Sequence, residues 1–150
     1  MIEVLITLII LSIGLLGLAA LQGNSMTSNH NAYIRSQATI LANDMADRMR
    51  ANMVGIRANN YNNLNGIPGD PGCISTAAGC TATQIATYDA FEWNTTLSQQ
   101  LPAGQGTVVG NGATFAITVR WDEARNGANG TGCDPANPAD MQCLILSVTL

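Results

Sequence analysis

The chain has 150 residues, six arginines, no lysine and ten acidic residues, which gives a net charge of −4. This length supports one domain of modest core with an appendage, and the acidic balance argues against a nucleic-acid-binding protein. Charged residues make up only 11% of the chain, against about 25% in an ordinary soluble domain. The composition argues against a cytosolic enzyme and predicts apolar surface that faces lipid or other subunits.

The first predicted element is an apolar helix over residues 4–21. Apart from Thr7, Ser12 and two glycines, this run is entirely apolar, and no charged residue occurs between Glu3 and Arg35. Eighteen helical residues rise about 27 Å, which is close to the ~30 Å hydrocarbon core of a bilayer. The run therefore predicts a helix that can lie in a membrane or among apolar helices of neighbouring chains.

Glu3 stands at the head of this apolar run. A secretory signal peptide or an ordinary signal anchor would explain the apolar residues, but neither explains an acid at this position. A carboxylate is costly to bury in lipid unless it meets a cation. We therefore predict that Glu3 pairs with an amine on another chain.

Helical periodicity continues past the apolar run to about residue 57. Apolar side chains recur every three or four residues and form a stripe: Ile34, Ala38, Leu41, Met45, Met49 and Met53. On the opposite face, Asp44 and Arg48, and Asp47 and Arg50, have the spacing of modest ion pairs within a helix. A helix over residues 2–57 is about 80 Å long, more than the remaining residues can cover, so its first half should protrude.

The change from apolar to polar sequence divides the chain into two parts. We expect a hydrophobic transmembrane or assembly helix over residues 1–27 and a globular headpiece over residues 28–150. Gly14 and Gly17 are the strong propensity breaks in the first part. They would either let a neighbouring helix approach closely or let the helix unwind locally, and the sequence does not choose between these roles.

The headpiece continues with a turn-rich loop over residues 59–80 and a second helix over residues 82–100. Thr81 and Gln84 have the spacing of a capping box, which marks the start of this helix, and Pro102 stops it. Its expected buried side chains are Ile85, Tyr88, Trp93, Leu97 and Leu101.

Strand signals fill the last third of the chain. Residues 107–109 run into Asn111-Gly112, a favourable hairpin turn, and residues 113–121 alternate apolar with polar side chains. A polar loop over residues 123–142 leads to a last strand at residues 143–149. The element order predicts an α+β headpiece in which an antiparallel sheet packs on the C-terminal half of the long helix, from Leu41 onward.

Four cysteines fall as two local pairs, Cys73 with Cys80 and Cys133 with Cys143. Four cysteines allow three pairings, and we favour the local one because each pair brackets a loop with no core of its own. The alternative is a zinc site, for which the spacings are unsuitable. Disulfides would place the headpiece in an oxidising compartment.

The sequence contains no recognisable catalytic motif, metal-ligand cluster or phosphate loop, so we expect no enzyme and no cofactor. The single histidine, His30, lies where the apolar run turns polar and suits an interfacial position. Asp122 and Glu123 are interpreted as a solvated turn. Asp134 and Asp140 leave open a weak calcium site in the loop between Cys133 and Cys143.

The segment MIEVLITLIILSIGLLGLAALQ resembles the N-terminal segment of type IV pilins and pseudopilins. In that family a leader ending in glycine is removed by a prepilin peptidase, and the new N-terminal residue is N-methylated. Glu3 matches the signature acid of the family. Met1 stands where the glycine and the first mature residues would be, so we expect the native chain to begin upstream of it.

The similarity extends into the headpiece. The motifs ADRMRAN at residues 46–52, YDAFEW at residues 88–93 and LP at residues 101–102 resemble PilV-type minor pilins of type IVa pili. The resemblance implies a pilin-like fold and a low-abundance subunit that primes pilus assembly at or near the tip. It also implies a headpiece that is periplasmic before assembly, when the single helix spans the inner membrane.

The partners implied by the resemblance are other minor pilins, the major pilin, the inner-membrane assembly platform and a tip adhesin. Nucleic acid is not among them. Two alternatives remain open. A minor pseudopilin of a type II secretion system would have the same fold in a different machine. An envelope-anchored binding module would use the helix only as a tether and would have no need of Glu3.

Overall fold

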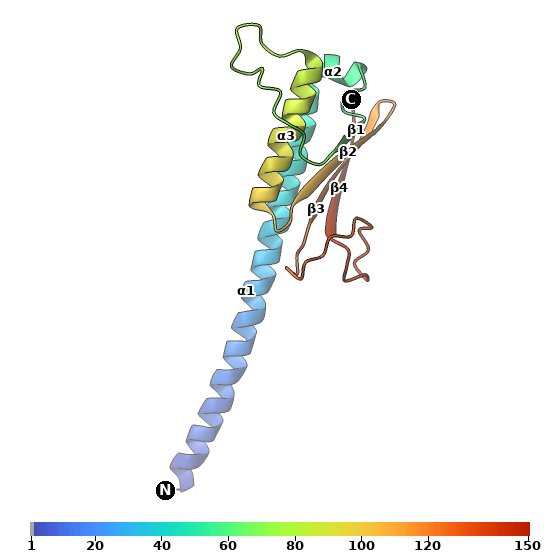
Figure 1. Ribbon diagram of the computed structural model, residues 1–150. Helices are drawn as coiled ribbons and strands as arrows, with labels where there is room; N and C mark the ends of the chain where they lie inside the picture. The colour runs from blue at the N-terminus through green and yellow to red at the C-terminus, as the bar shows by residue number, and fades with distance from the viewer. Residues whose placement is uncertain (1) are drawn as a thin grey trace. The chain divides into compact units, whose positions relative to one another are not determined.

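The computed structural model describes residues 2–150. Its elements, in chain order, are α1 (Ile2–Ala51), α2 (Met53–Arg57), β1 (Asn63–Asn65), α3 (Ala82–Gln100), β2 (Gln105–Asn111), β3 (Thr114–Trp121) and β4 (Gln142–Thr149) (Figure 1). The described residues form two compact units, one that ends at Ile34 and one that runs from Arg35 to Leu150. These elements confirm the predicted α+β class, with a long N-terminal helix and an antiparallel sheet.

The first unit consists of helical residues with exposed apolar side chains. Every large apolar side chain from Ile2 to Leu21 is more than half exposed. The hydroxyls of Thr7 and Ser12 donate to the carbonyl oxygens of Val4 and Ile9, both at 2.8 Å, so these polar groups are satisfied within the helix. By length and composition, α1 is the one helix among residues 2–150 that could cross a membrane.

The second unit begins with the C-terminal part of α1, which packs on the sheet with its apolar stripe. Ala38, Leu41, Met45 and Met49 are buried there, together with two alanines that the stripe did not include, Ala42 and Ala46. The predicted stripe is therefore confirmed over this stretch. Small alanines between the larger side chains let the helix approach its neighbours closely.

The long helix ends earlier than its periodicity predicts. A continuous helix to residue 57 is wrong, because α1 stops at Ala51 and the short helix α2 follows. At the break, Asn52 has φ −114° and ψ 59°, and its side chain accepts a hydrogen bond from the Gly55 amide at 3.0 Å. Asparagine competes for backbone hydrogen bonds and favours such caps. Met53, which the stripe included, is only half-buried in α2.

The four strands form one antiparallel sheet in the order β1-β2-β3-β4. The predicted hairpin is present, with Asn111 paired to Thr114 and Gly112 at φ +64°, a conformation that glycine adopts at little cost. The loop predicted over residues 59–80 is wrong in one respect, because it contains β1. In β1, Leu64 pairs with Val108 of β2. A three-residue strand is too short for its alternation to be recognised in the sequence.

The core lies between this sheet, the C-terminal part of α1, and α3. Phe115, Ile117 and Val119 of β3 are fully buried, as their alternation predicts. Helix α3 begins with the predicted capping box, in which Thr81 and Gln84 bond each other's backbone amides. Trp93, Leu97 and Leu101 are buried as expected. The expectation for Ile85 and Tyr88 is wrong, because both are half-buried, while Ala86, Asp89, Ala90 and Asn94 are buried instead.

Candidate functional site

Glu3 lies in the first turn of α1, where its carboxylate suits the positive end of the helix dipole. A Cβ added at Gly14 or Gly17 would have no atom within 4 Å, so nothing in the single chain requires glycine at either position. The pairing of Glu3 with an amine, and a role for the two glycines in helix packing or flexing, therefore stay predictions about the assembled state.

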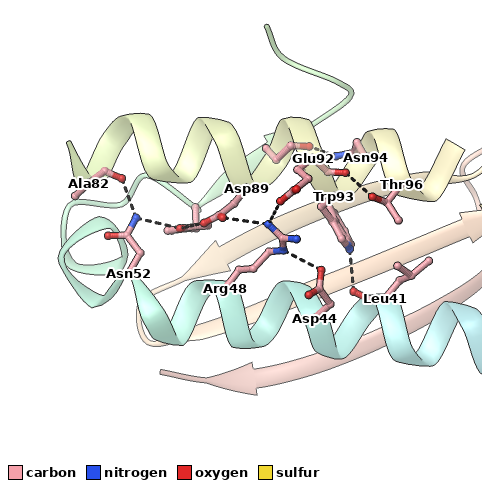
Figure 2. A network of polar contacts seen from close by, with 12 residues as sticks. Leu41, Asp44, Arg48, Asn52, Ala82, Asp89, Glu92, Trp93, Asn94 and Thr96 are labelled. Carbon is pink, nitrogen blue, oxygen red and sulfur yellow. Dashed lines mark hydrogen bonds and ion pairs between the residues drawn. The ribbon is translucent and has the colours of Figure 1, made fainter. Parts of the chain in front are cut away.

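The headpiece contains a polar cluster centred on Arg48 (Figure 2). The Arg48 Nε donates to Asp44 Oδ2 at 2.8 Å, which confirms the ion pair predicted from their spacing. The Arg48 Nη1 lies 2.5 Å from Glu92 Oε2 and 3.5 Å from Asp89 Oδ1, both on α3. One guanidinium thus contacts three carboxylates, one on its own helix and two on α3, and the latter two join α1 to α3. The interhelical partners were missed, because spacing along one helix carries no information about the neighbouring one.

The cluster continues through Tyr61 to the junction between α1 and α2. The Tyr61 hydroxyl, which is fully buried, donates to Asp89 Oδ2. The Asn52 Nδ2 donates to the Tyr61 oxygen at 3.0 Å and to the Ala82 carbonyl at 2.8 Å. Asn52 therefore caps α2 with its oxygen and ties the start of α3 with its nitrogen.

Burial and charge shift the pKa values in this cluster. Burial raises the pKa of the Asp89 carboxyl, although its bond from Tyr61 and the charge of Arg48 act in the opposite direction. Burial also raises the pKa of the Tyr61 phenol, and the bond to Asp89 raises it further. For Arg48, burial lowers the pKa, but bonds to Asp44 and Glu92 outweigh it and raise the pKa overall. At neutral pH the cluster therefore holds a charged arginine and a neutral tyrosine, and its contacts join α1 to α3.

Two further polar contacts position α3. The Trp93 indole Nε1 donates to the Leu41 carbonyl of α1 at 2.8 Å (Figure 2). The Asn94 Oδ1 accepts from the Gly106 amide of β2 at 2.8 Å. Both side chains are buried, so each bond fixes α3 against one of its two neighbours.

The interpretation of Asp122 and Glu123 as a solvated turn is wrong. Asp122 is buried, and its carboxylate accepts from the amides of Asn126 at 3.3 Å and Gly127 at 2.8 Å. Glu123 pairs with Arg35 of α1 at 3.2 Å. The Asn-Gly dipeptide four residues after Asp122 was a signal for such a turn, in which an aspartate caps backbone amides.

The cysteines form two disulfides, Cys73–Cys80 and Cys133–Cys143, which fit the local pairing. Inside the second loop, Asp140 Oδ2 accepts from the Asp134 amide at 3.2 Å, so this carboxylate serves the loop backbone. Across residues 2–150, no group of three or more His, Cys, Asp or Glu side chains could hold a metal ion. The two aspartates therefore carry no argument for calcium. His30 lies on α1, and its interfacial position stays a prediction.

The comparison with protein families agrees with this arrangement. Residues 20–91 match the model of the Tt1218-like family, which is described as type IV pilin Tt1218. The match runs from the end of the apolar run through the rest of α1 to the first half of α3. It supports a place for the chain in the type IV pilin superfamily, whose proteins are structural. No curated protein and no solved structure matches the chain. The long apolar helix and the antiparallel sheet are consistent with a pilin fold.

Proposed function

We propose that this chain is a minor pilin, a structural subunit that helps to prime a type IV pilus and sits at or near its tip. The observation that carries the proposal is the exposed apolar stretch of α1, free of charge from Val4 to Tyr33 and headed by Glu3. The pilin match supports it. In this proposal residues 1–27 form the transmembrane and assembly helix, and residues 28–150 form the headpiece.

The apolar stretch determines where the subunit resides. Before assembly, the apolar stretch lies in the inner membrane, and the headpiece with its two disulfides lies on the periplasmic side. After assembly, the apolar helices of neighbouring pilins replace the lipid. The partners are other minor pilins, the major pilin, the assembly platform and a tip adhesin.

Glu3 makes the transfer of the helix from lipid to the pilus specific for neighbouring pilin subunits. A carboxylate that leaves water for an apolar bundle is stabilised by an ammonium, and the N-terminal amine of the neighbouring subunit is the cation that a pilin offers. Because the pair forms at one axial offset between two helices, it also sets their register.

The experiment replaces Glu3 with alanine in the full chain and measures the protein in sheared pili. We expect loss from the pilus fraction at an unchanged membrane level. The control is Asp47→Ala, which removes an acid that is paired with Arg50 on the exposed face of α1 and should leave incorporation unchanged. Equal incorporation of Glu3→Ala and the wild type would contradict the proposal.

A gene deletion and the Glu3→Ala strain separate the alternatives. If the chain is a pseudopilin, deleting the gene should abolish protein secretion while pili remain. A tethered binding module predicts that Glu3→Ala leaves the membrane level and the activity of the headpiece unchanged, with no protein in pili.

A further inference from the structure

The face of the sheet that points away from α1 and α3 exposes apolar side chains of β2 and β4. Along β3, the inward-pointing Phe115, Ile117 and Val119 are buried. The intervening Ala116, Thr118 and Arg120 point to the opposite face, where Thr118 is also buried among its neighbours. Their cross-strand partners share this face. On this face Val109 of β2 is 57% exposed and Ile145 of β4 is 61% exposed, so both strands that flank β3 present accessible apolar surface.

Arg120 is the one charged side chain that the described strands place on this outward face. Its neighbours in register are Gln105 on β2 and Cys143 on β4, and the remaining positions are small, β-branched or amide residues. The chain as a whole carries a net charge of −4. Arg120 is therefore a lone cation among uncharged strand positions, in a chain that is acidic as a whole.

The part-buried guanidinium of Arg120 is only partly hydrogen-bonded. Its Nη1 donates to Thr107 Oγ1 at 3.0 Å, but its Nε is buried with no hydrogen-bond acceptor. Among residues 2–150 no carboxylate lies within ion-pair distance of it, in contrast to Arg35, Arg48 and Arg50, which all have one. Burial alone acts on the guanidinium and lowers its pKa. The chain thus bears the desolvation cost of this charge without the compensation of an ion pair.

We propose that the outward face of β2, β3 and β4 docks a neighbouring pilin subunit, which places an aspartate or glutamate on Arg120. The charge complementarity carries the choice of ligand, because a planar guanidinium binds a carboxylate through two parallel hydrogen bonds. Val109 and Ile145 add exposed apolar surface on the same face, and its burial against a partner would exclude water from the ion pair. The identity of the partner as a pilin rests on the proposed function.

The test compares Arg120→Met with Arg50→Met in the full chain. Methionine keeps the apolar stem but removes the charge. We expect Arg120→Met to reduce incorporation into sheared pili roughly tenfold or more, since a docked carboxylate would be left unpaired. Its thermal stability in detergent should stay the same or rise, because an uncompensated charge has been removed. Arg50→Met, at an exposed arginine, should change incorporation less than about twofold.

A photo-crosslinking residue at Ser147, which is exposed on the same face, identifies the partner. We expect a product with another pilin subunit that is lost when Arg120→Glu is added, and restored when the contacted acid is changed to lysine. Normal incorporation of Arg120→Met would overturn the inference, as would a parallel loss of incorporation and stability. Crosslinking to lipid, nucleic acid or no chain would also overturn it. Absence of the wild-type protein from pili would instead overturn the proposed function itself.

Discussion

Helix α1 carries apolar side chains along most of its length, but its two parts expose them to opposite degrees. Between Ile2 and Leu21 each large apolar side chain is more than half exposed, whereas Leu41, Met45 and Met49 are at most 6% exposed. The first part is apolar on every face, and the second confines its apolar side chains to one stripe. One element of secondary structure therefore serves two different environments, and the distribution of side chains around the helix distinguishes them.

The difference shows where each part obtains its stabilisation. The second part is buried by this chain's own sheet and by α3, so its contribution belongs to the folding of the headpiece. The first part leaves its apolar surface to be removed from water by something outside the chain, at roughly 25 cal/mol per Å². Mutations in the two parts should accordingly affect different measurements.

The largest expected effect on folding is at Met45. Replacing this fully buried side chain with alanine should destabilise the headpiece by about 2–5 kcal/mol, because a cavity remains between α1 and the sheet. We expect residues 28–150 to be soluble and folded with two disulfides, so urea unfolding of this fragment provides the measurement. Asp47→Ala is the control and should cost under about 1 kcal/mol. If the control were the more damaging change, the faces of the helix would be assigned wrongly.

A charge in the first part should act on membrane partitioning and not on folding. Leu11→Arg places a cation near the middle of the apolar run, at a cost of about 2.5–3.5 kcal/mol for membrane insertion. We expect the protein to be lost from carbonate-washed membranes, while Leu11→Ile retains it. Headpiece disulfides should form normally in both variants. A Leu11→Arg protein that stayed in the membrane but misfolded would reverse the assignment of the two parts.

A smaller effect is expected at Tyr61, within the polar cluster of the second part. Tyr61→Phe removes the hydroxyl that joins Asn52 to Asp89 and should cost about 1–3 kcal/mol at pH 7, measured by urea unfolding of residues 28–150. Tyr88→Phe, at a half-buried tyrosine of α3, is the matched control and should cost less. An equal cost at the two positions would contradict a structural role for the cluster.

The stability of the headpiece should also depend on pH through Tyr61. The pKa of Tyr61 is raised in the folded headpiece, so above about pH 10 the unfolded chain loses a proton that the folded chain keeps. Stability is therefore complete below that pH and declines as the pH rises toward the folded pKa. We expect this alkaline decline in the free energy of unfolding to be weaker in Tyr61→Phe than in the wild-type headpiece, and a decline of equal size would contradict the burial of the Tyr61 phenol.

Much of the fold could be predicted because its signals are local. The stripe of α1, the capping box at Thr81 and the Asn111-Gly112 turn each depend on residues within a few positions of one another. The contacts of Arg48 with α3 could not be predicted, since they depend on how closely two helices approach. The burial of Asp122 was missed for a different reason. An aspartate that precedes a polar loop is normally expected to be exposed to solvent. The break at Asn52 was also overlooked, although asparagine is a common cap.

The packing of Trp93 against β2 has an evolutionary consequence. At Gly106 a Cβ would lie 2.3 Å from the Trp93 ring and 2.5 Å from a Leu97 methyl group, so the strand has no space for any side chain. Trp93 in turn reaches Leu41 of α1, so it cannot withdraw without giving up that bond. Positions 93, 97 and 106 are thus free to vary only together: a lineage that gains a side chain at 106 must first gain space at both 93 and 97.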